Sequence, residues 1–141
     1  MEVFKYFKWR INPDLSILQF IESNVAISVS DNLGRIIYTN NRFCSKMESK
    51  ENELLGVVNS IFLSKIHKAP FYKNLWKTLE TGCLWKGVLN YKTKSEKIIC
   101  FETTIVPLKD NKGIVESYVF MYLDACESKL DCHQTSYTQY S

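Results

Sequence analysis

Residues 80–125 read ETGCLWKGVLNYKTKSEKIICFETTIVPLKDNKGIVESYVFMYLDA, and this stretch decides the fold class. Three runs rich in β-branched and aromatic residues are separated by two polar turns, which predicts three antiparallel strands. The runs also carry Trp85, Asn90 and Tyr122 where a plain sheet would place Val or Ile. These side chains raise the question of what one face of this small sheet holds.

A second pair of strands is predicted earlier in the chain. Residues 24–40, NVAISVSDNLGRIIYTN, alternate on both sides of the tetrapeptide DNLG. In that turn Asp31 and Asn32 tolerate tight geometry, and Gly34 supplies a positive φ. The pattern therefore predicts a β-hairpin.

Helical patterns fill the region between the two groups of strands. Residues 40–56 predict two short helices, the second capped by Ser49. Residues 69–82 predict a longer helix with leucines at helical spacing and a stop at Gly82. This order predicts an α+β domain, with a five-stranded antiparallel sheet and short helices covering one face.

The composition is that of one globular domain, with 141 residues, 45% hydrophobic and 23% charged. No apolar run approaches the roughly 20 residues that a membrane span needs. The first residues lack the pattern of a signal peptide, so we expect no membrane span and a cytoplasmic location. Five cysteines without CxxC spacing favour free thiols over disulfides.

We expect three segments in the chain. Residues 1–15 are predicted to form an N-terminal cap helix with an aromatic side, residues 16–126 the folded domain, and residues 127–141 a polar tail. Exposed apolar stripes usually mark an interface, so the cap predicts a homodimer.

Positive charge is concentrated in residues 62–97, which hold eight Lys, two Glu and no Arg. A nucleic-acid surface would use Arg and interleaved exposed aromatics. We therefore interpret this region as a solvated face and expect no nucleic-acid partner.

Several motifs resemble the PAS domain family over residues 16–126. The sequence SDNLGRIIYTNNRF carries the family's Asp-x-x-Gly-x-Ile-x-x-x-Asn hairpin, and ENELLG, FYKNLWKTLETGCLWKG, VPLKDNKGIVESYV and LDA follow in the family's order. The pattern is most similar to the flavin-binding PAS domains of aerotaxis receptors and nitrogen-fixation redox regulators. It is more distantly similar to the light-sensing LOV branch.

The resemblance implies a PAS fold whose inner sheet face and covering helices enclose a pocket for FAD or FMN. Trp85 and Trp76 would then be walls of that pocket. Asn40 matches an asparagine that aerotaxis relatives need for flavin binding, and Asn90 matches one that pairs with the flavin ring edge in LOV relatives. Tyr122 stands where LOV relatives carry a glutamine on the last strand.

The same residues also allow structural interpretations. Trp76 has the spacing of a core residue, and Trp85 is frequent in PAS sequences whatever their ligand. Asn40 is suited to cap a helix. Asn90 would face solvent if the strand register differs by one residue.

Other chemistries are less well supported. Heme would need an axial imidazole, for which His67 is the candidate. No clustered Cys and His predict a metal site. Ser60 stands where LOV relatives carry their reactive cysteine, which argues against light-driven adduct formation. Cys44 or Cys83 could serve as a redox-sensitive thiol.

We therefore expect a sensory signalling domain rather than an enzyme. It would bind a small ligand or cofactor, with flavin favoured, and signal through a homodimer and a downstream protein or output domain. One alternative is a ligand-free module for dimerisation or docking, with the pocket filled by its own side chains, such as Phe62, Phe101, Phe120 and Met121. A third hypothesis is a small thiol-dependent enzyme.

Overall fold

The computed structural model of the chain describes residues 24–62 and 70–124. The predicted cap helix at residues 1–15, the polar tail at 127–141 and His67 lie outside the described residues.

Five antiparallel strands form one sheet in the order β2-β1-β5-β4-β3. Their bounds are Ala26–Asp31 for β1, Ile36–Thr39 for β2, Trp85–Lys92 for β3, Ile98–Lys109 for β4 and Val115–Asp124 for β5. Both predicted strand groups are confirmed, and the first and last strands meet in the middle of the sheet.

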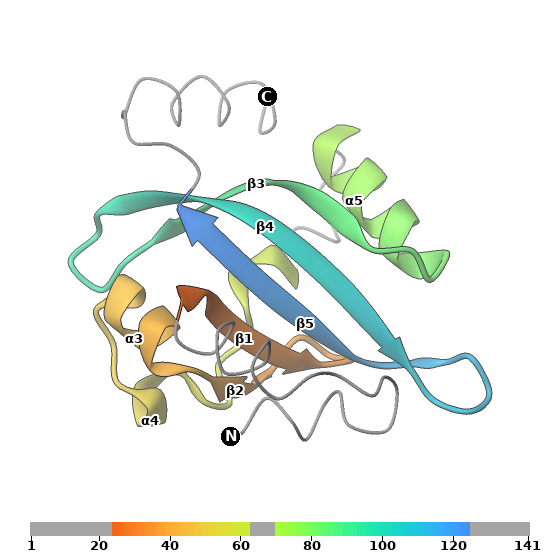
Figure 1. Cartoon of the computed structure of the whole chain (residues 1–141), viewed down its shortest axis with the longest axis horizontal. Helices are drawn as coiled ribbons and strands as arrows, with labels where there is room; N and C mark the ends of the chain where they lie inside the picture. The colour runs from red at the N-terminus through yellow and green to blue at the C-terminus, as the bar shows by residue number, and fades with distance from the viewer. Residues whose placement is uncertain (1–23, 63–69, 125–141) are drawn as a thin grey trace.

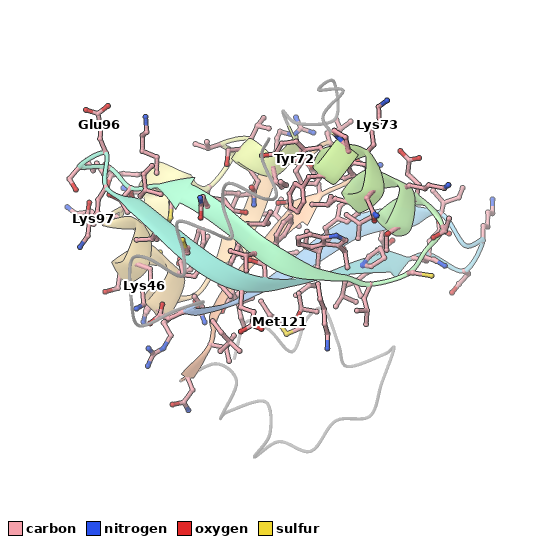
Figure 2. The ribbon with its side chains drawn as sticks, turned by 90° about the horizontal axis from the view of Figure 1, so that it is seen from above. Lys46, Tyr72, Lys73, Glu96, Lys97 and Met121 are labelled. Carbon is pink, nitrogen blue, oxygen red and sulfur yellow. The ribbon has the colours of Figure 1, made fainter. Side chains whose placement is uncertain are left out.

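Among the described residues between β2 and β3, the structure has three helices: α3 at Asn41–Met47, α4 at Glu51–Leu54 and α5 at Pro70–Glu80. α3 packs against β1, whereas α5 packs against β3 and β4. Figure 1 shows α3 and α4 beside β1 and β2 at one end of the twisted sheet and α5 at the opposite end. In Figure 2, Tyr72 of α5 and Met121 of β5 lie on opposite sides of the sheet. The predicted two-layer α+β architecture is confirmed.

The sheet has an aromatic inner face and an aliphatic outer face. On the inner face, buried rings from β3, β4 and β5 join Phe43 of α3 and Leu75 and Leu79 of α5 in one core cluster. On the outer face, a second buried cluster has four aliphatic side chains and one ring: Ile27, Val29, Leu108, Val119 and Tyr38. Because strand side chains alternate in direction, the register decides which residues reach the inner layer.

The β1–β2 turn has the predicted chemistry. The Asp31 carboxylate accepts hydrogen bonds from the backbone N–H groups of Leu33 and Arg35, both at 2.9 Å. Gly34 has a φ of +90°. A Cβ at Gly34 would collide with the ring of Phe62, so this glycine also allows the turn to touch the core.

The end of α5 is the Schellman motif expected from a glycine after the last helical turn. Gly82 has a φ of +84°, and its N–H donates to the Leu79 carbonyl at 3.0 Å. The Cys83 N–H donates to the Thr78 carbonyl at 3.2 Å. The predicted stop at Gly82 is confirmed.

The predicted cap of the second short helix is wrong by one residue. The helix starts at Glu51, so its N-cap is Lys50 rather than Ser49. Glu53 Oε1 accepts the N–H of Lys50 at 2.9 Å, while the Ser49 hydroxyl donates to the Met47 carbonyl at 3.2 Å. Glu53 in the first turn thus satisfies the backbone N–H of the N-cap residue, which is the glutamate's half of a capping box.

We expect Gly34→Ala to lower the free energy of unfolding by about 2–4 kcal/mol, because it combines a left-handed backbone with a collision in the core. Urea unfolding measures the loss. Gly113→Ala is the matched control, since Gly113 has a φ of +81° and nothing within 4 Å of an added Cβ. Equal losses in the two variants would show that Phe62 contributes nothing to the requirement for glycine.

Candidate functional site

The centre of the inner layer is a buried tyrosine hydroxyl. Tyr122 lies on β5 with 1% of its surface exposed. Its ring contacts Phe43 of α3 and Phe101 of β4, each at a centroid distance of 4.9 Å. An oxygen placed among aromatic rings must be hydrogen-bonded, because a buried polar group without a partner is costly.

Three side chains from distant parts of the chain surround the Tyr122 hydroxyl. Ser28 Oγ of β1 lies 3.0 Å away and the Tyr91 hydroxyl of β3 lies 3.2 Å away. Asn59 Nδ2 donates to the Tyr122 oxygen at 3.4 Å, and Asn59 Oδ1 accepts from the Tyr91 hydroxyl at 3.2 Å. We call Ser28, Asn59, Tyr91 and Tyr122 the hydroxyl network.

Burial raises the pKa of Tyr122 to about 12, although hydrogen bonds from Ser28, Tyr91 and Asn59 act in the opposite direction. The phenol therefore stays neutral at physiological pH. The network offers neutral hydrogen-bonding groups only, so its chemistry suits orientation and binding rather than proton transfer.

The sequence reasoning identified Tyr122 but missed Asn59, which is 2% exposed. The available signal was a lone amide in the apolar run GVVNSIFLS, since a buried amide needs partners that an apolar run cannot supply. Its backbone N–H donates to the Gly34 carbonyl at 2.8 Å.

Trp76 occupies a core position on α5. It is 5% exposed, and its ring contacts Phe62 at 4.9 Å and Tyr118 at 6.0 Å between centroids. The three rings meet at steep angles, which is the geometry of aromatic packing. This placement agrees with the structural interpretation of Trp76; a role in ligand binding stays a prediction.

Trp85 begins β3 on the inner face and is 8% exposed. Its indole lies over Gly87, where a Cβ would collide with the ring. On its other side it meets Phe71 of α5 edge-on, at 5.6 Å between centroids. The Trp-x-Gly motif therefore has a packing reason of its own, because only glycine leaves room for the indole above the strand.

Asn40 is a helix cap and a brace for β1. Its Oδ1 accepts the N–H groups of Phe43 at 2.9 Å and of Ile27 at 3.0 Å. Its Nδ2 donates to the Val25 carbonyl at 2.7 Å. The amide is thus used by the backbone of α3 and of the β1 strand region, as the capping interpretation expected.

The register corrects the expectation that Trp85 and Asn90 line one cavity. Asn90 pairs with Cys100, and its neighbours Leu89 and Tyr91 both belong to the inner core. Side chains alternate along a strand, so Asn90 lies on the outer face. Asn90 lies five positions after Trp85, and an odd number of positions places two side chains on opposite faces of a regular strand.

The described cysteines are free thiols, with Cys83 exposed and Cys44 and Cys100 half-buried. Within residues 24–62 and 70–124, no group of His, Cys, Asp and Glu is arranged to hold a metal ion. No helix in those ranges has the length and apolar character to cross a membrane.

We expect Asn40→Ala to lower the free energy of unfolding by about 3 kcal/mol, since it removes a helix cap and leaves the buried N–H of Ile27 without its acceptor. Chemical denaturation gives the value. Asn41→Ala is the matched control because Asn41 is an exposed neighbour, and we expect a change within about 0.5 kcal/mol. A loss below about 1 kcal/mol at Asn40 would contradict the bracing role.

The Tyr122 phenol should make the fold sensitive to alkali. Its pKa is 10.0 when exposed and about 12 in the folded chain. Below pH 10 both states hold the proton; above it the unfolded chain releases the proton first, so stability falls as the pH rises from 10 to about 12. Tyr122→Phe should lose less stability over this interval in alkaline denaturation. Equal losses of stability in the wild type and in Tyr122→Phe would show that the Tyr122 phenol is not the cause of the alkaline sensitivity.

The PAS domain family model matches residues 24–125 of the chain. Two nitrogen fixation regulatory proteins, from Klebsiella oxytoca and Klebsiella pneumoniae, are each 26% identical to it over 129 residues. These matches cover 88% of this chain and 26% of each relative, so the chain spans about a quarter of the length of the curated relatives it matches.

Solved structures share the fold at low sequence identity. A light-oxygen-voltage domain studied with a flavin analogue matches with a TM-score of 0.65 and 18% identity, over 91% of this chain and 98% of that one. The dark structure of the blue-light photoreceptor Aureochrome1 LOV matches with a TM-score of 0.65 and 19% identity, over 92% and 96%. The family model covers almost all of the described sheet and helices, and the chain belongs to the PAS domain family.

Proposed function

We propose that this chain is a sensory signalling domain that passes its signal through protein contacts and does not itself catalyse a reaction. The observation that carries the proposal is the state of the inner layer. Its hydroxyls bond to one another and to the Asn59 amide, and its side chains form one core cluster that includes Phe43 and Trp85. A stimulus would act by repacking this layer.

The packing of the inner layer supports a role in transmitting a structural change through the domain. The docking alternative is supported by Phe62, Phe101 and Phe120, which belong to the inner core cluster, whereas Met121 packs against the outer cluster. A filled interior transmits displacement well, because packed side chains have few alternative arrangements.

Flavin sensing is the second candidate. It is supported by the similarity to nitrogen fixation regulatory proteins over 88% of the chain and by the light-oxygen-voltage neighbours. Trp76, Trp85 and Tyr122 all belong to the inner core, where FAD or FMN would lie. Asn90 would join them only after a one-residue shift of β3. Heme is a third candidate, and its axial ligand would be His67, which lies outside the described residues.

We expect the domain to act as a cytoplasmic homodimer with a downstream signalling protein or output domain. The outer face of the sheet supports this, since Leu123 and Ile98 on neighbouring strands β5 and β4 are 51% and 55% exposed. Exposed apolar side chains that lie together on a sheet commonly form protein–protein interfaces.

The visible absorption spectrum of freshly purified full chain separates the candidates. We expect a featureless trace together with a concentration-dependent dimer in analytical ultracentrifugation. The twin bands of an oxidised flavin would replace the docking role with redox or light sensing, and a Soret band would indicate heme. A featureless trace from a chain that stays monomeric at all concentrations would contradict the proposed contact function.

A further inference from the structure

Asn59 connects the buried hydroxyl network to the surface of the domain. Its side chain bonds to Tyr91 and Tyr122 inside the core. Its backbone N–H holds the Gly34 carbonyl of the β1–β2 turn at 2.8 Å, and its carbonyl accepts the Phe62 N–H at 2.9 Å. One residue thus joins two interior strands, one surface turn and the segment that continues toward α5.

Residues 55–58, which we call the edge segment, lie beside β2 at the margin of the sheet. Gly56 N–H donates to the Ile36 carbonyl at 2.8 Å, and Ile36 N–H donates to the Val57 carbonyl at 2.9 Å. Arg35 and Val58 complete an isolated antiparallel bridge. The edge segment therefore behaves as a short sixth strand, closed at its end by the Asn59 N–H.

Side-chain burial contributes little to holding this segment. Leu55, Val57 and Val58 are 39%, 50% and 41% exposed, and an added Cβ at Gly56 would have nothing within 4 Å. The buried anchor that follows directly is Asn59. Segments with exposed side chains and few buried contacts open at low free energy, so the anchor decides how often this one opens.

We propose that Asn59 couples the buried tyrosine hydroxyls to the edge segment, so that loss of the hydroxyl network releases residues 55–58 from β2. The Tyr91 and Tyr122 hydroxyls hold the Asn59 side chain by hydrogen bonds. The Asn59 backbone N–H, bonded to the Gly34 carbonyl, then holds the end of the edge segment beside the β1–β2 turn. Release would change a surface that carries three exposed aliphatic side chains. Under the proposed sensory function, this is a route by which repacking of the interior reaches the surface.

Amide hydrogen exchange in the full chain tests the coupling. The reporters are the N–H groups of Ile36, Gly56 and Asn59, which close the edge. Tyr122→Phe keeps the ring and removes the hydroxyl. We expect the three reporters to exchange about fivefold faster, the factor that corresponds to one lost hydrogen bond. Tyr91→Phe should act in the same direction because it also removes a bond to Asn59.

Tyr118→Phe is the matched control. Tyr118 is an inner-face tyrosine on the same strand as Tyr122, and its ring packs against Phe62 and Trp76. It should leave the three reporters unchanged. The amide of Ile105, a fully buried residue on the interior strand β4, should exchange at the wild-type rate in every variant.

Three results would overturn the coupling: unchanged reporters in both Tyr122→Phe and Tyr91→Phe, equal acceleration in Tyr118→Phe, or equal acceleration at Ile105, which would mean global destabilisation. The measurement needs no ligand or partner. The coupling can therefore fail while the contact function stands, and a monomeric chain could still show it.

Discussion

The Tyr122 hydroxyl is the constraint on which the inner layer depends. A phenol oxygen with 1% of its residue exposed must find its hydrogen bonds inside the protein. Its partners come from β1, from β3 and from the segment after α4, between 31 and 94 residues away along the chain. Satisfying one oxygen therefore links β5 to β1, to β3 and to the segment after α4 through side-chain hydrogen bonds. Ring packing tolerates small displacements, whereas hydrogen bonds require specific distances and angles and so constrain where the Tyr122 oxygen lies.

Much of the fold could be predicted because local chemistry decides it. The Asp31 carboxylate and Gly34 specify the first hairpin, and Gly82 ends α5. Boundaries were less predictable where two polar residues compete, as at Ser49 and Lys50 before α4. The turn between β3 and β4 contains no glycine, and Glu96 adopts a left-handed backbone there, with a φ of +67°. A non-glycine residue in that conformation costs about 1–2 kcal/mol, which the paired strands on both sides offset.

The candidate site was harder to predict than the fold, because it depends on register. A strand has a period of two, so Asn90 cannot face the same side as Leu89 and Tyr91. The sequence motifs identify residue types but not the face of the sheet on which each side chain lies. Tyr91 was not selected as a site residue from the sequence, although the structure puts its hydroxyl beside that of Tyr122 at 3.2 Å. Partners such as Asn59, far away in sequence, emerge only once the strands and the turn are placed together.

The packing of the inner layer also decides what a ligand would have to do. A planar ligand between α5 and the sheet would separate Trp76 from Phe62 and Tyr118, whose centroids lie within 6.0 Å of it. Each displaced ring gives up contacts of about 0.5–1.5 kcal/mol beyond its buried area, so the ligand must replace several of them. A ligand edge that reached Tyr122 would compete with Asn59 for the same oxygen. Binding in the interior and release at the surface would then be one event, because both are decided by which partner the Tyr122 hydroxyl holds.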